Sequence, residues 1–390
     1  MLQLEALQAN DGDCLLLHFG SAATPGLILI DGGSAGVYRD VLSKRLDQLR
    51  NNRPALDIRL VVVSHIDADH ITGIVDMFRQ MSERVNSGQQ PLWRVGSLWH
   101  NAFDKVMGKH PQSAASASVA AAASASVDPA QLNNLQKKGL TDLKALAVVA
   151  SVKQGNDLQS FANKLTKINA ETNGDLVEAP ESGRRDIKIG KSLNFTVLGP
   201  KQAELNDLEK EWKKSKAKHP ADENAAAADY LNRTVPNLSS IVFLAEEKKS
   251  NGSPTRMLLT GDAGGDLILD GLKSAGLLDR NKQIKVDVLK VQHHGSNHSV
   301  TEDFFGQVVA DRYVISGNGK HGIPHPDTLH WLSSARKGKP YHAFLTNRHL
   351  QDGQKDLTKG LSDFLAEEKA KQPKHIYHFR DDDAFSITVA

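Results

Sequence analysis

Cysteine and aromatic residues are scarce in this sequence, and each shortage excludes a class of site. A single cysteine, Cys14, among 390 residues can form neither an internal disulfide nor a zinc site built from several thiolates, and we expect it to be a packing residue. Any metal site must therefore use imidazoles and carboxylates, for which the chain offers 16 histidines and 46 acidic residues. Aromatic side chains make up only 5% of the chain, which argues against a surface that stacks bases.

Long apolar segments and an excess of one charge are also missing. The 48 basic and 46 acidic residues give a formal net charge of +2, so no overall basic field marks a bulk binder of nucleic acid. Apolar runs such as residues 60–63 are far shorter than the roughly 20 residues that cross a bilayer, and the first residues lack the basic segment of a signal peptide. We therefore expect a soluble, cytoplasmic protein with no membrane partner.

The hydrophobic pattern predicts alternating strands and helices. Apolar residues at helical spacing predict helices at 37–49, 71–81 and 328–335. Short apolar runs bounded by glycine or proline predict strands at 14–20, 26–33, 58–65, 186–198, 239–247, 255–262, 286–294, 311–318, 341–347 and 383–390. Since 39% of the residues are hydrophobic and strands alternate with helices, the sequence predicts a layered α/β core rather than a helical bundle.

Two segments differ in character from the rest of what we expect to be a single domain, 1–390. Residues 100–182 have the composition of a helical insertion, and the Ala/Ser-rich stretch at 113–127 within it is either a helix or a linker. Residues 201–232 form a charged helical segment. Acids and bases alternate in it, which is typical of a solvated helix rather than a nucleic-acid-binding arm.

The segment that ends the predicted strand at 58–65 carries the sharpest chemical signal. It reads HIDADH and contains His65, Asp67, Asp69 and His70. Imidazoles and carboxylates at this spacing beyond a buried strand can converge on one or two ions. The alternative is a polar loop in which an aspartate caps the next helix, but such loops rarely have two flanking histidines. The motif therefore favours a metal site.

Three later motifs end predicted strands in the same way. Asp262 closes TGD, His293 and His294 open HHGS, and His325 stands in GIPHP. In open α/β sheets, ligands collect at the carboxyl ends of the strands. These residues are therefore expected to join the HIDADH motif around metal.

Together with Asp31 in LIDGG, these motifs resemble the metallo-β-lactamase fold superfamily. The match is closest to the soluble domain of ComEC-type DNA-uptake proteins and their stand-alone relatives, and it covers roughly residues 4–99 and 186–345. The resemblance implies an αββα sandwich that carries a two-metal hydrolase site. Two positions depart from the commonest pattern of the superfamily, because Asp67 replaces its second histidine and Asn237 lies where its third motif usually has a histidine.

Carried over by position, the resemblance implies two divalent ions, Zn²⁺ or Mn²⁺, bridged by Asp262. The implied ligands are His65 and Asp67 for the first ion, Asp69, His70 and His325 for the second, and His293 in place of the missing third-motif ligand. Asp69 and His294 are assigned to catalysis. Asp31, Asn237 and Ser296 are expected to orient the ligands or to contact substrate.

The charge of the implied ligand set favours two ions over one. Asp67, Asp69 and Asp262 bring three negative charges, so one divalent ion would leave a net −1. Two ions give +1, which a bridging hydroxide neutralises. With Asp67 in place of histidine, the ligand set contains one more hard oxygen donor. Mn²⁺ or Mg²⁺ is therefore a rival to Zn²⁺ as the bound metal.

The resemblance predicts a phosphodiesterase or nuclease that acts on nucleic acid or a nucleotide. Lys290, Lys320 and Arg348 lie near the motifs and favour a phosphate substrate. One alternative is hydrolysis of a carboxylic ester, lactone or thioester, since a fold does not fix a function. Another is a non-catalytic, metal-stabilised module that binds a protein partner through residues 100–235.

Overall fold

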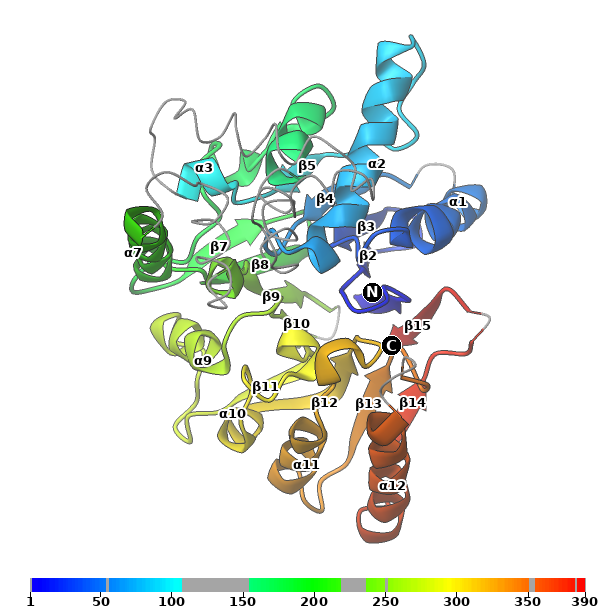
Figure 1. Cartoon of the computed structure of the whole chain (residues 1–390), viewed down its shortest axis with the longest axis vertical. Coiled ribbons are helices and arrows are strands. Elements are labelled where there is room, and N and C mark those ends of the chain that lie inside the picture. The colour runs from blue at the N-terminus through cyan, green and yellow to red at the C-terminus, as the bar shows by residue number, and fades with distance from the viewer. Residues whose placement is uncertain are drawn as a thin grey trace.

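The computed structural model describes residues 2–53, 56–106, 154–218, 236–249, 252–350, 355–382 and 384–389. In this part of the chain, two mixed β-sheets lie face to face, and helices pack on the outer face of each sheet (Figure 1). The predicted αββα sandwich is therefore confirmed. The Ala/Ser-rich stretch at 113–127 lies outside the described residues, as do 107–112, 128–153 and 219–235.

The first sheet has seven strands in the described residues, in the order β15-β1-β2-β3-β4-β5-β6. Their bounds are Gln3–Leu7 (β1), Leu15–Gly20 (β2), Pro25–Ile30 (β3), Ile58–Val62 (β4), Ser97–Trp99 (β5), Lys167–Ile168 (β6) and Ser386–Val389 (β15). Neighbours from β15 to β3 are antiparallel, whereas β3 to β6 run parallel. The pairing of β1 with β15 brings the two ends of the chain together (Figure 1).

The second sheet has eight strands in the described residues, in the order β14-β13-β12-β11-β10-β9-β8-β7. Their bounds are Arg185–Lys188 (β7), Leu193–Gly199 (β8), Val242–Glu247 (β9), Thr255–Leu259 (β10), Ile284–Lys290 (β11), Val308–Ile315 (β12), Tyr341–Leu345 (β13) and His375–Phe379 (β14). Neighbours from β7 to β10 are antiparallel, and β10 to β14 run parallel.

Helices cover the outer face of both sheets. On the first sheet these are η1 (Tyr38–Leu42), α1 (Ser43–Asn52) and α2 (Ala68–Asn86). On the second they are α9 (Gly265–Ser274), α10 (Glu302–Gln307), α11 (Pro326–Ala335) and α12 (Lys355–Lys371). The remaining described elements are α3 (Phe103–Val106), η2 (Ala170–Thr172), α7 (Gln202–Lys218), η3 (Pro236–Ser239), η4 (Gln292–Gly295), η5 (Lys320–Gly322) and the helical residues 154–162.

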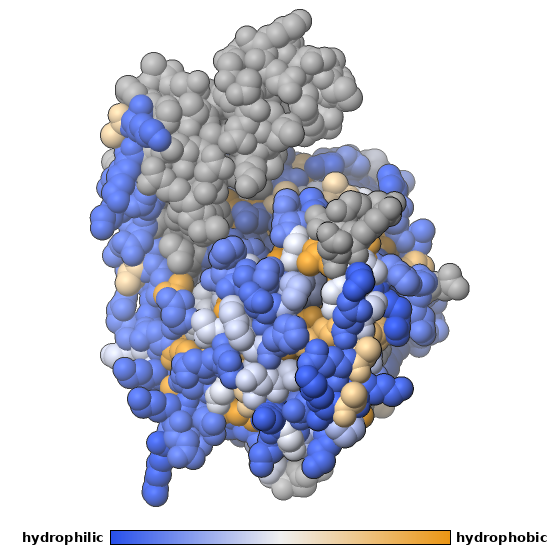
Figure 2. Space-filling view, turned by 60° about the horizontal axis from the view of Figure 1, so that its bottom comes forward, coloured by the Kyte–Doolittle hydropathy of each residue, from blue (hydrophilic) through white to orange (hydrophobic). Residues whose placement is uncertain are grey.

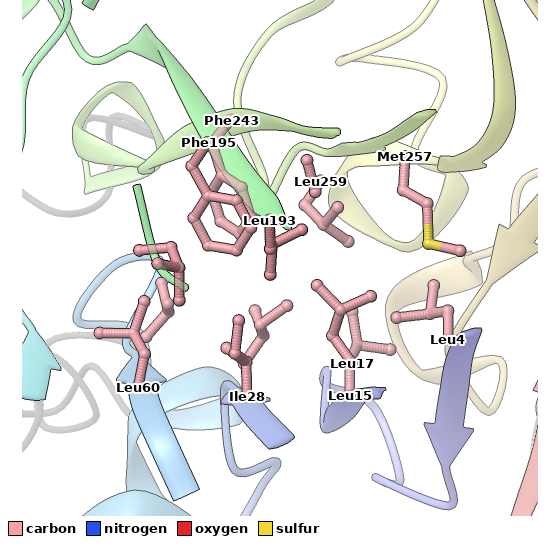
Figure 3. Packing of buried hydrophobic residues seen from close by; sticks show 14 of the residues in the cluster. Leu4, Leu15, Leu17, Ile28, Leu60, Leu193, Phe195, Phe243, Met257 and Leu259 are labelled. Atoms are coloured by element: carbon pink, nitrogen blue, oxygen red, sulfur yellow. The ribbon is translucent and has the colours of Figure 1, made fainter. Parts of the chain in front are cut away.

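The main core lies between the inner faces of the sheets. Side chains alternate between the two faces of a strand, so Leu15 and Leu17 of β2 point inward while Leu16 packs under the outer helices. Figure 3 shows Leu15 and Leu17 on one side of this core and Leu193 and Phe195 on the other, with all four side chains pointing into the same layer. This packing fixes the position of one sheet relative to the other. It thereby also fixes the positions of the loops at the ends of the strands.

The structure differs from the sequence prediction at several elements. The run at 186–198 forms a hairpin, because Gly190 lies in the turn that separates β7 from β8. The segment at 100–182 was predicted to be helical, but it contributes β6, which pairs with β5, as well as helical residues. Helix α7 covers the first half of the predicted charged segment, and residues 219–232 lie outside the described residues.

The surface carries few large apolar side chains. Among the described residues, only Val85 and Ile376 are large hydrophobic residues with exposed side chains. Figure 2 shows one face that is mostly hydrophilic, with apolar residues in small separate areas. None of the described helices is long and apolar enough to cross a bilayer.

A buried carboxylate joins four elements on the first sheet. Glu5 of β1 contacts the Nε2 atom of His18 at 3.0 Å, accepts a hydrogen bond from Arg45 Nε at 2.6 Å, and accepts one from the hydroxyl of Ser386. Burial raises the pKa of Glu5, but hydrogen bonds from His18, Arg45 and Ser386 outweigh this effect and lower the pKa to about 2.

We predict that this carboxylate makes stability depend on pH in acid. The folded-state pKa of about 2 lies below the ordinary value of 4.5, so ionised Glu5 stabilises the fold above pH 4.5 and this contribution disappears as the pH falls towards 2. Linkage gives a contribution on the order of 3 kcal/mol. Denaturant unfolding between pH 7 and pH 2 should show a shallower pH dependence for Glu5→Gln than for the parent. Glu83 is exposed, so Glu83→Gln should show the same pH dependence of stability as the parent.

Candidate metal centre

Five parallel-running strands deliver polar side chains to one rim of the sandwich. Parallel neighbours end on the same side of a sheet, and the loops beyond β3, β4, β10, β11 and β12 contact one another there. These loops carry Asp31 after β3, Ser64 and His65 after β4, Asp262 after β10, His293 and His294 after β11, and Ser316 after β12. The expectation that distant motifs meet at one rim is met for these residues.

The HIDADH segment links β4 to α2. Asp67 takes the N-cap position of α2 with an extended backbone, but its side chain makes no capping hydrogen bond. Its Oδ2 atom lies 3.6 Å from His65 Nε2 instead. The aspartate therefore does not act as the ordinary helix cap that was the alternative interpretation of this motif.

Asp262 lies at the centre of the cluster, and four imidazoles face it with their Nε2 atoms. The Nε2 atom of His70 is 3.3 Å from Asp262 Oδ1. Three further Nε2 atoms approach Asp262 Oδ2, at 3.5 Å for His294, 3.8 Å for His293 and 4.0 Å for His65. Asp69 joins from α2, with its Oδ2 atom 3.4 Å from His294 Nε2 and 3.8 Å from His70 Nε2.

These donors fit a divalent cation. The atoms that face one another are imidazole nitrogens and carboxylate oxygens, which are ligands of Zn²⁺ and Mn²⁺. Two of them, His65 Nε2 and Asp262 Oδ1, are buried without a hydrogen-bond partner. Leaving buried polar atoms without partners is costly, and coordination to a cation satisfies them. Ligand atoms from Asp13, His70, Asp262 and His294 all lie within 4.8 Å of one another.

The protonation of the side chains shows that the cluster attracts positive charge. Burial lowers the pKa of His70 and His294, but the surrounding carboxylates, with Asp262 the strongest of them, together outweigh burial and hold both pKa values well above the ordinary range. Burial raises the pKa of Asp262, yet the His70 and His294 imidazoliums hold it well below its usual value. The cluster thus favours positive charge at positions where a divalent cation would supply it.

The Nδ1 side of the imidazoles is held by other groups. Asp31 Oδ2 lies 2.9 Å from His70 Nδ1, and its Oδ1 atom accepts a hydrogen bond from the backbone N–H of Ser64 at 2.7 Å. The Ser64 hydroxyl donates to Asp31 Oδ2 at 2.7 Å and lies 3.0 Å from His65 Nδ1. Asp31 thus lies on the Nδ1 side of His70, where a carboxylate can orient the ring.

The adjacent histidines of HHGS both reach Asp262, but from different environments. Both have left-handed backbone conformations, with φ of 48° for His293 and 53° for His294, which residues other than glycine adopt mainly at functional or strained positions. The His294 side chain is 1% exposed and also faces Asp69, whereas that of His293 is 24% exposed. This placement favours His294 rather than His293 as the ligand, the reverse of the sequence prediction.

His325 is not brought into the cluster. Its ring accepts a hydrogen bond from the backbone N–H of Asp327 at 3.2 Å and lies 3.4 Å from the Asp327 carboxylate. Among the described residues, no ion-pair contact joins its ring to Asp262 or His70. Its role as a ligand stays a prediction, although its backbone N–H bonds to Gly295 O next to the HHG turn.

Asn237 and Ser296 lie beside the histidines rather than among the converging atoms. Asn237 Nδ2 is 3.4 Å from His293 Nδ1, which also lies 2.8 Å from Ser299 Oγ. The hydroxyl of Ser296 accepts a hydrogen bond from the backbone N–H of His298 at 3.3 Å. Their predicted contact with substrate is not tested by this arrangement.

The sequence prediction omitted Asp13, which the β1–β2 loop brings against the cluster, with its Oδ1 atom 3.6 Å from His294 Nδ1. Gly12 makes this approach feasible, because a Cβ atom there would lie 1.7 Å from the carbonyl oxygen of Asp69. The signal available in the sequence was the Gly-Asp pair of NDGD. Lys290 is buried against Asp13 in an ion pair.

The three cations that favoured a phosphate substrate are placed differently from one another. Lys290 is 1% exposed and paired with Asp13, so it does not face solvent. Lys320 is half-exposed and pairs with Asp11. The Arg348 guanidinium stacks on the Phe379 ring at 4.2 Å.

Comparison with known proteins gives a likeness to solved structures only. No family model matches the chain, and no curated protein matches it. The solved structures include YhfI from Bacillus subtilis, described as a metallo-β-lactamase fold protein, with 12% identity over 100% of both chains and a TM-score of 0.38. They also include unliganded yeast PDE1, with 12% identity over 98% of both chains and a TM-score of 0.39. At these values the likeness carries no conclusion about the site, whose features come from the geometry above.

We predict that Gly12→Ala disrupts the centre. The added methyl group must displace the backbone of Asp69 or the loop itself, and such overpacking costs about 1–3 kcal/mol. Divalent metal should bind more weakly, as measured by chelator competition, and unfolding should occur at lower denaturant. In Gly306→Ala, nothing lies within 4 Å of the added Cβ atom. This control should keep wild-type metal binding, and equal effects in both variants would contradict the prediction.

We also predict that His294→Ala releases bound metal more completely than His293→Ala does. The reason is that His294 is buried and faces both Asp262 and Asp69. Metal content after desalting, measured by elemental analysis, checks this, with His298→Ala as a control at a neighbouring imidazole. If His293→Ala releases the metal and His294→Ala retains it, the sequence-based assignment is correct instead.

Proposed function

We propose that this chain is a metal-dependent hydrolase that cleaves phosphodiesters, with nucleic acid or a nucleotide as substrate. The observation that carries the proposal is the convergence of imidazole Nε2 atoms and carboxylates around Asp262. The side chains of His65, His70 and Asp262 are at most 4% exposed, so the inner side of the cluster is closed. Asp67, Asp69 and His293 are 32%, 29% and 24% exposed, so the cluster opens on their side.

The charge of the cluster supports two ions. Asp67, Asp69 and Asp262 together bring three negative charges, and the surrounding imidazoles are neutral when they bind metal. Two divalent ions at such a site lower the pKa of a bound water towards neutrality and stabilise the charge that develops on a phosphoryl group. His65 and Asp67 would hold one of them, His70, His294 and Asp69 the other, and Asp262 would be shared.

The exposed residues are placed to act on substrate. Asp69 presents a partly exposed carboxylate next to His294 Nε2, where it can orient a water molecule or accept its proton. Burial lowers the pKa of His293. Ser299 and Asn237 hold its Nδ1 side, and this leaves Nε2 to face the reacting group. The His294 side chain is 1% exposed, so we assign it to metal binding rather than to contact with substrate.

The second candidate is hydrolysis of a carboxylic ester, lactone or thioester. The burial of Lys290 favours it, because that ammonium is paired with Asp13 and does not contact substrate. Phosphate recognition then depends on bound metal and on half-exposed Lys320. The two candidates differ in the charge of the substrate, which makes them separable by a substrate panel.

We predict that the protein loaded with Mn²⁺ or Zn²⁺ cleaves at least one of bis-p-nitrophenyl phosphate, single-stranded DNA and RNA. Asp262→Ala should reduce this activity to background, since it removes the carboxylate that the imidazoles share. Asp266→Ala, which removes a carboxylate from the first turn of α9, is the matched control and should stay active.

The same preparation should be tested on p-nitrophenyl acetate, a lactone and a thioester. Turnover on these esters alone would replace the phosphodiesterase proposal with the second candidate. A protein that holds metal but cleaves none of the six substrates would favour the non-catalytic module.

A further inference from the structure

Two carboxylates lie behind the imidazoles, on the side away from the metal-binding atoms. Asp262 and Asp69 approach the Nε2 atoms of His70 and His294. Asp31 instead contacts the Nδ1 atom of His70, and Asp13 Oδ1 lies 3.6 Å from the Nδ1 atom of His294. Asp13 therefore faces the same side of His294 that Asp31 faces on His70. Asp13 has no role in the proposed function.

The Asp13 carboxylate is already engaged through both oxygens. Its Oδ2 atom pairs with the Lys290 ammonium, and both side chains are only 1% exposed. Its Oδ1 atom accepts a hydrogen bond from the Ser316 hydroxyl. A divalent ion at Asp13 would lie next to a buried ammonium of the same sign. Asp13 is thus suited to support a ligand rather than to be one.

The hydroxyl of Ser316 connects Asp13 to His294. Ser316 has one proton to donate, and in donating it to Asp13 it leaves its oxygen lone pairs free to accept. The Nδ1 atom of His294 lies 3.1 Å from this oxygen, within reach to donate its N–H. A proton on Nδ1 leaves the lone pair of His294 on Nε2, which faces Asp262 at 3.5 Å. Lys290, at the far end, balances the buried negative charge.

We propose that Lys290, Asp13 and Ser316 form a positioning chain that fixes the tautomer and ring orientation of His294, so that its Nε2 atom binds metal. The inference rests on the metal centre of the proposed function. Asp31 and Ser64 serve His70 and His65 in the corresponding way. The positioning chain crosses between the sheets, because Asp13 lies between β1 and β2 whereas Lys290 ends β11 and Ser316 follows β12.

The first test measures metal affinity and the electronic absorption spectrum of the Co²⁺-loaded protein in the absence of substrate. Ser316→Ala removes the link and should weaken metal binding about 10–100-fold, the range found when supporting partners of ligands are lost. Its Co²⁺ spectrum should also change. Ser316→Thr keeps a hydroxyl and should show the wild-type metal affinity and the wild-type Co²⁺ spectrum. Ser97→Ala deletes another buried hydroxyl with two hydrogen bonds, on β5, and should leave both readouts unchanged.

The second test examines whether Asp13 and Lys290 act as a unit. Asp13→Asn and Lys290→Met should each weaken metal binding, and the double variant should be no weaker than the poorer single variant. Circular dichroism of the metal-free proteins must show that each is folded at the temperature of the titration. A role in stability alone would lower the unfolding midpoint of these variants without changing the affinity or the Co²⁺ spectrum of the folded protein.

The outcomes separate this inference from the proposed function. Normal metal binding without phosphodiester cleavage would remove the proposed substrate class and leave the positioning chain intact. Wild-type affinity and spectrum in Ser316→Ala would overturn the positioning chain, and so would additive effects of Asp13→Asn and Lys290→Met. Loss of a whole equivalent of metal in Asp13→Asn, with Ser316→Ala unaffected, would make Asp13 a ligand and also overturn it. A wild-type protein that binds no divalent ion would overturn both proposals.

Discussion

The site depends on the concentration of buried charge around Asp262. A carboxylate that is 4% exposed faces four imidazoles, and two further carboxylates lie beside it. Such a cluster is unfavourable in a protein interior unless each charge has a counter-charge. The carboxylates accordingly hold the pKa values of His70 and His294 well above the ordinary range. The same demand for positive charge underlies affinity for divalent ions.

The arrangement divides into a side whose atoms fit metal ions and a side that holds the imidazoles in place. Asp69 and Asp262 face Nε2 atoms, whereas Asp13 and Asp31 face the Nδ1 side, directly or through a serine. Carboxylates of identical chemistry thus acquire different roles from their position relative to an imidazole ring. The sandwich makes this division feasible because loops from both sheets meet at one rim.

The sequence indicated those site residues that lie close together along the chain. It did not indicate the residues that only the fold brings to the site. HIDADH and HHGS each place several donors after one strand, so spacing alone indicated that they converge. Asp13 is one carboxylate in a short loop, and its partners Lys290 and Ser316 belong to the other sheet. The position of His325 after a strand likewise suggested a ligand, and its ring contacts Asp327, so this role stays a prediction. The hairpin of β7 and β8 was predicted as a single strand, because one turn at Gly190 interrupts an otherwise continuous pattern.

The pairing of the first strand with the last has a consequence for how the centre is assembled. Strand β15 pairs with β1 through Leu4 and Val389, and the backbone N–H of Gln8 bonds to Phe385 O just before the loop that carries Gly12 and Asp13. The position of the loop that carries Asp13 therefore depends on residues that are distant from it in the sequence. A substitution that detaches β15 is expected to loosen the metal centre although it alters none of the side chains that converge on Asp262.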